Sequence, residues 1–111
     1  MKPFPWRPGM LTTTGERVLV VHDDRLTFAG FGAPAKDYQP DQNDPATLGA
    51  LLGAVEDAWA HLGVITIIPP VAASMGEPWR LRLTITLGDF WPIRSAPTRF
   101  DLLVAAWWEV P

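Results

Sequence analysis

Apolar side chains recur at three- and four-residue spacing between residues 44 and 63, as they do along one face of a helix. Local chemistry also indicates both ends of this helix. Asp44 can accept the amide hydrogens of a first turn, Pro45 suits the first helical position, and Gly63 can end the last turn in a left-handed conformation. The segment therefore predicts one complete helix. Its apolar stripe comprises Leu48, Leu51, Leu52, Val55, Trp59 and Leu62.

Two strands are predicted after this helix, with a loop at residues 71–78 between them. Residues 64–68 are β-branched throughout and are followed by two prolines, which favours a strand that stops there. Residues 79–87 alternate between apolar and polar, which is typical of an antiparallel strand with one face on a core. The apolar face comprises Trp79, Leu81, Leu83, Ile85 and Leu87.

A hairpin is predicted before the helix. Residues 17–21 and 26–31 are rich in strand-forming side chains, and the polar run of residues 22–25 between them suits a turn. Prolines keep residues 1–15 extended as an arm, and residues 32–43 are predicted to form a loop that leads into the helix.

The C-terminal segment, residues 98–109, has two interpretations. Thr98 can cap a helix that carries Asp101 in its first turn, but the nearly continuous apolar sequence would also suit a buried strand. The alanines at positions 105 and 106 favour the helix. A helix here would have a core stripe of Phe100, Leu103, Val104 and Trp107, with Leu102 on the opposite side.

The element order is then β-β-α-β-β-α. We expect an α+β fold in which two helices cover one face of a four-stranded, mostly antiparallel sheet, because this arrangement buries both helical stripes. Residues 1–15 would be the arm and residues 16–111 a single domain. The predicted core includes Leu52, Val55, Trp59, Leu81, Leu83 and Ile85.

Composition narrows the possible functions. The 111 residues include no cysteine, which excludes disulfides, thiolate nucleophiles and Cys-based metal sites. A net charge of −3 argues against general binding to nucleic acid, which normally needs a basic face. The apolar runs are too short to span a bilayer and the N-terminus is unlike a secretory signal, so we expect a cytoplasmic protein without membrane contact.

Catalytic signatures are weak. His22 lies beside two aspartates, but a polar turn also favours such residues, and His61 is explained by a favourable position at the end of the helix. Neither serine lies in a nucleophile elbow, and no glycine-rich loop precedes a predicted helix with the lysine of a phosphate loop. We therefore expect no enzymatic activity, no cofactor and no metal.

Aromatic residues offer the better candidates for a binding surface. Six of the residues are tryptophan, which is favoured at protein interfaces because it is large, rigid and amphipathic. Three of them, as well as Leu102, lie off the predicted core faces, although the arm could also fold onto the domain's own core. Two arginines share the polar face of a predicted strand and could contact an acidic partner. The candidate interface comprises Trp6, Trp91, Leu102, Trp108, Arg80 and Arg82.

The run Asp44-Pro45-Ala46-Thr47-Leu48-Gly49-x-Leu51-Leu52-x-x-Val55-x-x-Ala58-Trp59 resembles a segment of small uncharacterised proteins from tailed phages and prophages. Trp79-Arg80-Leu81 and the segment of residues 97–106 are similar to later elements of the same proteins. The resemblance implies a phage or prophage origin and a helix in the C-terminal segment. It implies no activity and no site residue.

Two functional hypotheses follow. The first is a non-enzymatic phage-type protein that binds another protein, for example as an inhibitor of a host or defence protein. The alternative is a structural or accessory component of a phage particle that associates with itself.

Overall fold

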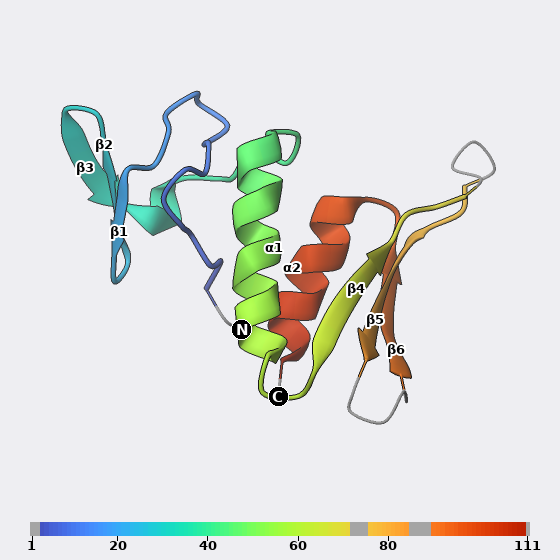
Figure 1. Cartoon of the computed structure of the whole chain (residues 1–111). Helices are drawn as coiled ribbons and strands as arrows, with labels where there is room; N and C mark the ends of the chain where they lie inside the picture. Colours follow the sequence, from blue (N-terminus) through green and yellow to red (C-terminus); the bar gives the residue numbers. More distant parts are fainter. Residues whose placement is uncertain (1–2, 72–75, 85–89, 111) are drawn as a thin grey trace. The chain divides into compact units, whose positions relative to one another are not determined.

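The computed structural model describes residues 3–71, 76–84 and 90–110, and it has an α+β fold. The chain divides into two compact units. We call residues 3–52 the N-terminal unit and residues 53–111 the C-terminal unit. Helix α1 (Pro45–Trp59) begins in the first and ends in the second (Figure 1).

The N-terminal unit contains a three-stranded antiparallel sheet in the order β1-β2-β3. Strands β1 (Val20–His22) and β2 (Arg25–Phe28) form the predicted hairpin, with Asp23 at a positive φ of 53° in the turn. Strand β3 (Phe31–Pro34) lies where the sequence predicted the end of one strand and the start of a loop. Gly30, at a φ of 91°, reverses the chain after β2 and divides the predicted strand in two.

The core of this unit is made by side chains from its strands, its irregular segments and α1. Phe28 contacts the rings of Phe31 and Tyr38, with centroids 5.0 and 4.9 Å away. Tyr38 follows a short 3₁₀ helix, η1 (Ala35–Asp37). The buried apolar residues of the unit include Met10, Val18, Leu26, Phe28 and Leu51.

Helix α1 begins where the sequence predicts. The Asp44 carboxylate accepts hydrogen bonds of 2.9 Å from both the amide and the hydroxyl of Thr47. The helix ends at Trp59, earlier than predicted, and the Trp59 carbonyl accepts the amides of Leu62 and Gly63. Gly63 is not among the glycines with a positive φ, so the predicted left-handed ending is wrong. Leu62 lies beyond the helix and is 38% exposed, rather than part of its stripe.

The C-terminal unit contains a second antiparallel sheet in the order β4-β5-β6. Its strands are β4 (Val64–Ile68), β5 (Trp79–Thr84) and β6 (Phe90–Ala96). The predicted alternation holds along β5, where Leu81 and Leu83 are buried. Of the other predicted core residues, Leu52 is half-buried, and Ile85 lies outside the described residues.

Strand β6 was not predicted from the sequence, and it contains a proline, Pro92. Proline is tolerated on an edge strand, where an N–H is not needed on the solvent side. β6 is such an edge strand, and its register with β5 shifts at Leu81 and Arg82. With β3 and β6 added, two three-stranded sheets take the place of the predicted single sheet of four strands.

Helix α2 (Arg99–Glu109) settles the ambiguity of the C-terminal segment in favour of a helix. The Thr98 hydroxyl accepts the Asp101 amide at 3.1 Å, as expected for the predicted cap. The strand interpretation of this segment is wrong.

Candidate functional site

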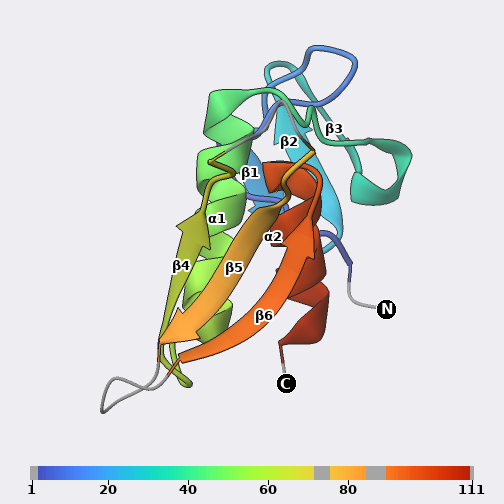
Figure 2. The ribbon, with the colours of Figure 1, turned by 90° about the vertical axis from the view of Figure 1, so that its right-hand side faces the viewer.

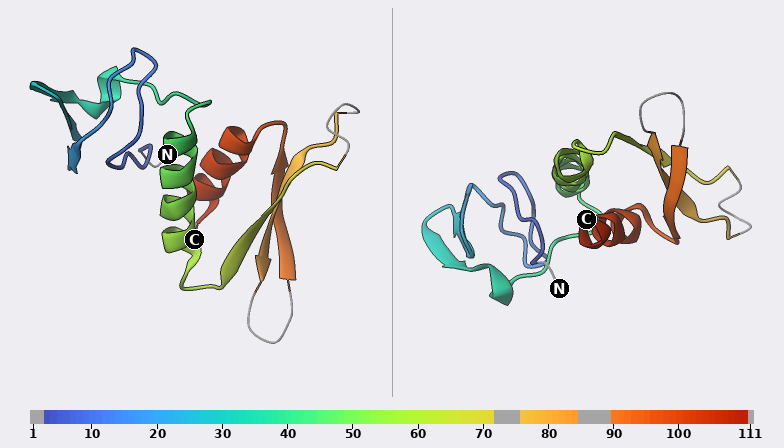
Figure 3. Two further views of the ribbon diagram at one scale, coloured as in Figure 1. Left: turned by 45° about the horizontal axis from the view of Figure 1, so that its top comes forward. Right: turned by 90° about the horizontal axis from the view of Figure 1, so that it is seen from below.

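Helix α2 has partners on two sides within the C-terminal unit. It packs against β5 and β6 on one face of the sheet (Figures 2 and 3). On another side, the indole Nε1 of Trp59, at the end of α1, donates a 3.0 Å hydrogen bond to the Ala106 carbonyl. These contacts bury Phe100, Leu102, Leu103 and Ala106.

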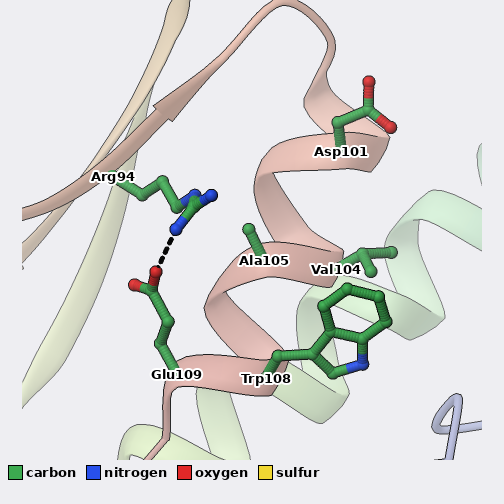
Figure 4. A pocket seen from close by; sticks show the side chains of 6 residues that line it. All are labelled: Arg94, Asp101, Val104, Ala105, Trp108 and Glu109. Atoms are coloured by element: carbon green, nitrogen blue, oxygen red, sulfur yellow. Dashed lines mark hydrogen bonds and ion pairs between the residues drawn. The ribbon is translucent and has the colours of Figure 1, made fainter. Parts of the chain in front are cut away.

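The remaining face of α2 is open. Asp101, Val104, Ala105 and Trp108 follow one another at the spacing that aligns side chains along a helix. Together with Glu109 and with Arg94 from β6, they line an open hollow of about 350 Å³, which we call the α2 hollow (Figure 4). The row from Asp101 to Trp108 extends about 10 Å along the helix axis.

Trp108 is the most prominent side chain of the α2 hollow. It is 48% exposed, and its ring lies beside Val104 (Figure 4). Ala105 is small and leaves the space between this ring and the other side of the hollow free. An indole that is held by a neighbour but is half-exposed offers a rigid apolar surface to another molecule.

Charged groups border this apolar surface. Arg94 and Glu109 form an ion pair on one side, and both side chains are partly exposed. The Asp101 carboxylate lies at the other end of the row (Figure 4). Two carboxylates and one guanidinium leave the α2 hollow with a net negative charge.

The predicted interface residues have different environments. Trp108 is exposed and lines the hollow, but Leu102 is fully buried, so the prediction that it lies opposite the core stripe is wrong. The buried face of α2 is centred on Leu102, Leu103 and Ala106, because Trp59 and the sheet approach the helix from different sides. Val104 and Trp107, predicted as core, are only half-buried.

None of the other candidates is among the described residues that line the α2 hollow. Trp6 belongs to the N-terminal unit, where it is half-buried and has its ring 5.1 Å from that of Phe4. Arg80 is exposed and paired with Glu77 at 3.4 Å, and Arg82 is half-buried on the same strand. The side chain of Trp91 lies outside the described residues.

Arg94 and Glu109 were not predicted as members of the site. They are 15 positions apart and belong to a strand and a helix, so their proximity depends on how β6 and α2 pack. Glu109 could be noticed only as a charge at the end of the predicted helix.

A polar cluster in the N-terminal unit has a structural explanation. Arg17 donates two hydrogen bonds, of 3.1 and 3.3 Å, to the Asp44 carboxylate that caps α1. These bonds are the main reason why the pKa of Asp44 lies below its ordinary value, with bonds from Thr47 adding to the effect. The Thr47 hydroxyl in turn accepts the Leu11 amide at 2.8 Å. The cluster ties three backbone segments together.

The two histidines occupy open positions. His22 Nε2 lies 3.5 Å from the Asp23 carboxylate, and both side chains are more than four-fifths exposed. His61 is exposed in the turn after α1. Within residues 3–71, 76–84 and 90–110, no three histidine or acidic side chains gather in a way that could hold a metal ion.

Comparison with known proteins adds no relative. No family model, curated protein or solved structure shows a significant similarity to this chain. As to membranes, neither described helix combines the length and the apolar character that crossing a bilayer requires.

Proposed function

We propose that this chain is a non-enzymatic binding protein that contacts a partner protein through the α2 hollow. The observation that carries the proposal is the half-exposed Trp108 beside Val104, on a face of α2 that lines an open hollow. Tryptophan contributes more than most residue types to binding energy at protein interfaces.

The shape of the α2 hollow favours a protein partner. The hollow is open and runs along about two turns of helix, so it suits a side chain that projects from a larger surface. Its apolar middle matches a large apolar side chain. The Asp101 carboxylate, at the end of the row, matches a lysine or arginine on the partner. Trp108 could also take the cation of that residue on its ring face.

A phage or prophage origin, as the sequence resemblance implies, would make a host or defence protein the natural partner, and inhibition the natural consequence of binding. This part of the proposal rests on the resemblance alone.

The proposal is tested by capture of partners from bacterial lysate with the wild-type chain, Trp108→Ala and Phe31→Ala. Phe31 is a matched control, because it is an aromatic side chain of similar exposure (46%) in the other unit. We expect a partner that the wild type and Phe31→Ala retain and that Trp108→Ala binds at least about tenfold more weakly, as hot-spot truncation implies. Equal capture by a folded Trp108→Ala chain would contradict the role of the hollow.

Self-association as a structural or accessory component is the second candidate. The observation that favours self-association is that β4 is an edge strand, paired on one side only among the described residues. Light scattering of the wild-type chain over a concentration series tests this candidate, since a chain that stays monomeric at all concentrations would contradict it and leave only a foreign partner.

A further inference from the structure

The two edges of the C-terminal sheet are protected to different degrees. β6 contains Pro92, which has no N–H to offer, and Arg94, and its register is irregular. Prolines, charged side chains and bulges are the usual means by which proteins prevent pairing at an edge strand. The other edge, β4, has none of these features over its five residues.

The outer edge of β4 has no partner among the described residues. β4 pairs only with β5, from Val64 opposite Thr84 to Ile68 opposite Arg80. In an antiparallel ladder, alternate residues of an edge strand direct their N–H and C=O groups away from the neighbouring strand. β4 therefore offers a row of backbone donors and acceptors that another strand can satisfy. Val64, at its start, is 67% exposed.

The sequence of β4 is nearly the same in both directions. About Thr66 as centre, Val64 corresponds to Ile68, and Ile65 corresponds to Ile67. A contact between two copies related by a twofold axis places each residue opposite its counterpart, so it requires a self-complementary strand. In antiparallel pairing about Thr66, aliphatic β-branched side chains would face one another on both sides of a central threonine pair. Such pairs stabilise sheets.

The two arginines on the strand next to this edge, Arg80 and Arg82, permit the same pairing. Arg82 lies opposite Thr66 on β5, so the two Arg82 residues of a paired sheet would be separated by three strand spacings. That separation is about 14 Å, which is beyond the screening length at physiological salt. β4 itself contributes no charge.

We propose that two copies of this chain associate through antiparallel pairing of their β4 strands, centred on Thr66, to form one continuous six-stranded sheet. This pairing specifies the second candidate function, self-association, and does not depend on partner binding at the α2 hollow. β4 lies at the edge of the sheet, whereas α2 packs against β5 and β6.

Light scattering of the full chain, from about 1 µM to about 500 µM, tests this pairing because it covers the range of weak to moderate dimers. We expect a concentration-dependent dimer in the wild type. Thr66→Lys should raise the dissociation constant about fivefold or more, since it places two like charges opposite each other. Thr66→Glu should do the same, and an equimolar mixture of the two variants should associate more tightly than either alone.

Ser95→Lys is the matched control. Ser95 is exposed on the opposite edge strand and is paired with Arg80, so it lies on the same sheet face as Thr66. This variant should dimerise like the wild type, and circular dichroism should show that all variants remain folded. The proposal is overturned by a wild type that stays monomeric, by a Thr66→Lys chain that dimerises normally, or by a dimer that only Trp108→Ala disrupts.

Discussion

The two units of this chain hold their backbones in place by different means. In the N-terminal unit, side chains bind backbone and one another across irregular segments, as in the chain of contacts from Arg17 through Asp44 and Thr47 to Leu11. In the C-terminal unit, apolar packing prevails: Leu83 on β5 and Leu103 on α2 are almost fully buried.

The difference follows from how much regular structure each unit has. Repetitive backbone satisfies its own hydrogen bonds, so a sheet and a helix need only apolar faces to associate. The N-terminal unit has short strands and long connections, whose backbone groups need other partners. The Thr12 hydroxyl, for example, accepts the Glu16 amide and donates to the Glu16 carboxylate. Polar side chains therefore have a larger structural role in that unit.

Truncation of the C-terminal core should have the largest effect on stability. Leu83→Ala leaves a cavity in the C-terminal core and should lower the free energy of unfolding by about 2–5 kcal/mol, the range for a well-packed leucine. Urea denaturation measures the change. Thr84→Ala, at the half-buried neighbouring position, is the control. A loss of stability below about 1 kcal/mol would show that this core is loosely packed. That result would contradict the conclusion that apolar packing holds the C-terminal unit together.

The next largest loss of stability should come from removing the cap of α1. This loss should be greater than the loss from removing the cap of α2. Asp44→Ala loses the bonds to Thr47 and to Arg17, whereas Thr98→Ala loses one bond to Asp101 and should cost about 1 kcal/mol. Asp44→Asn separates the two roles of the residue, because asparagine also caps helices but carries no charge for Arg17. Equal losses for the two alanine variants in urea denaturation would refute the special role of polar contacts in the N-terminal unit.

Acid should weaken the N-terminal unit through two carboxyl groups. Hydrogen bonds from Arg17 lower the pKa of Asp44, and those from Thr14 and Thr12 lower the pKa of Glu16. A group whose pKa is lower in the folded state stabilises the fold above its unfolded pKa, and this contribution disappears as the pH falls through the folded pKa. Stability should therefore decrease as the pH falls below about 4, near the ordinary pKa of these carboxyls. Asp44→Asn should reduce the slope of stability against pH, as measured by urea denaturation between pH 2 and pH 6.

The smallest effect on stability is expected at the α2 hollow. Trp108→Ala removes a half-exposed ring and should change the free energy of unfolding by no more than about 1 kcal/mol, whereas Leu102→Ala should cost about 2–5 kcal/mol. Thermal unfolding of the two variants side by side measures the contrast. Should Trp108→Ala destabilise the chain as much as Leu102→Ala, the indole would be a core residue and the proposed interface would lose its main support.

Part of the candidate site and of its surroundings could be predicted from residues that are close together in the sequence. Thr98 and Asp101 predicted where α2 begins. Trp108 lies off the predicted core stripe of this helix, and it is indeed an exposed aromatic residue. The partners of Trp108 in the hollow were harder to identify. Arg94 belongs to β6, which was not predicted, so its contact with Glu109 could not be predicted from the sequence either.

The sequence by itself determined the two helices, their first residues, the first hairpin, and strands β4 and β5. Each of these depends on side chains within a few positions of one another, such as Asp44 with Thr47 or the alternation around Leu83. Only the tertiary structure decided that β3 and β6 are strands and that Leu102, rather than Val104, faces the core. Strand pairing and the choice of a buried face are made by distant parts of the chain, because a half-apolar helix or a proline-containing strand is completed only by the element that packs against it.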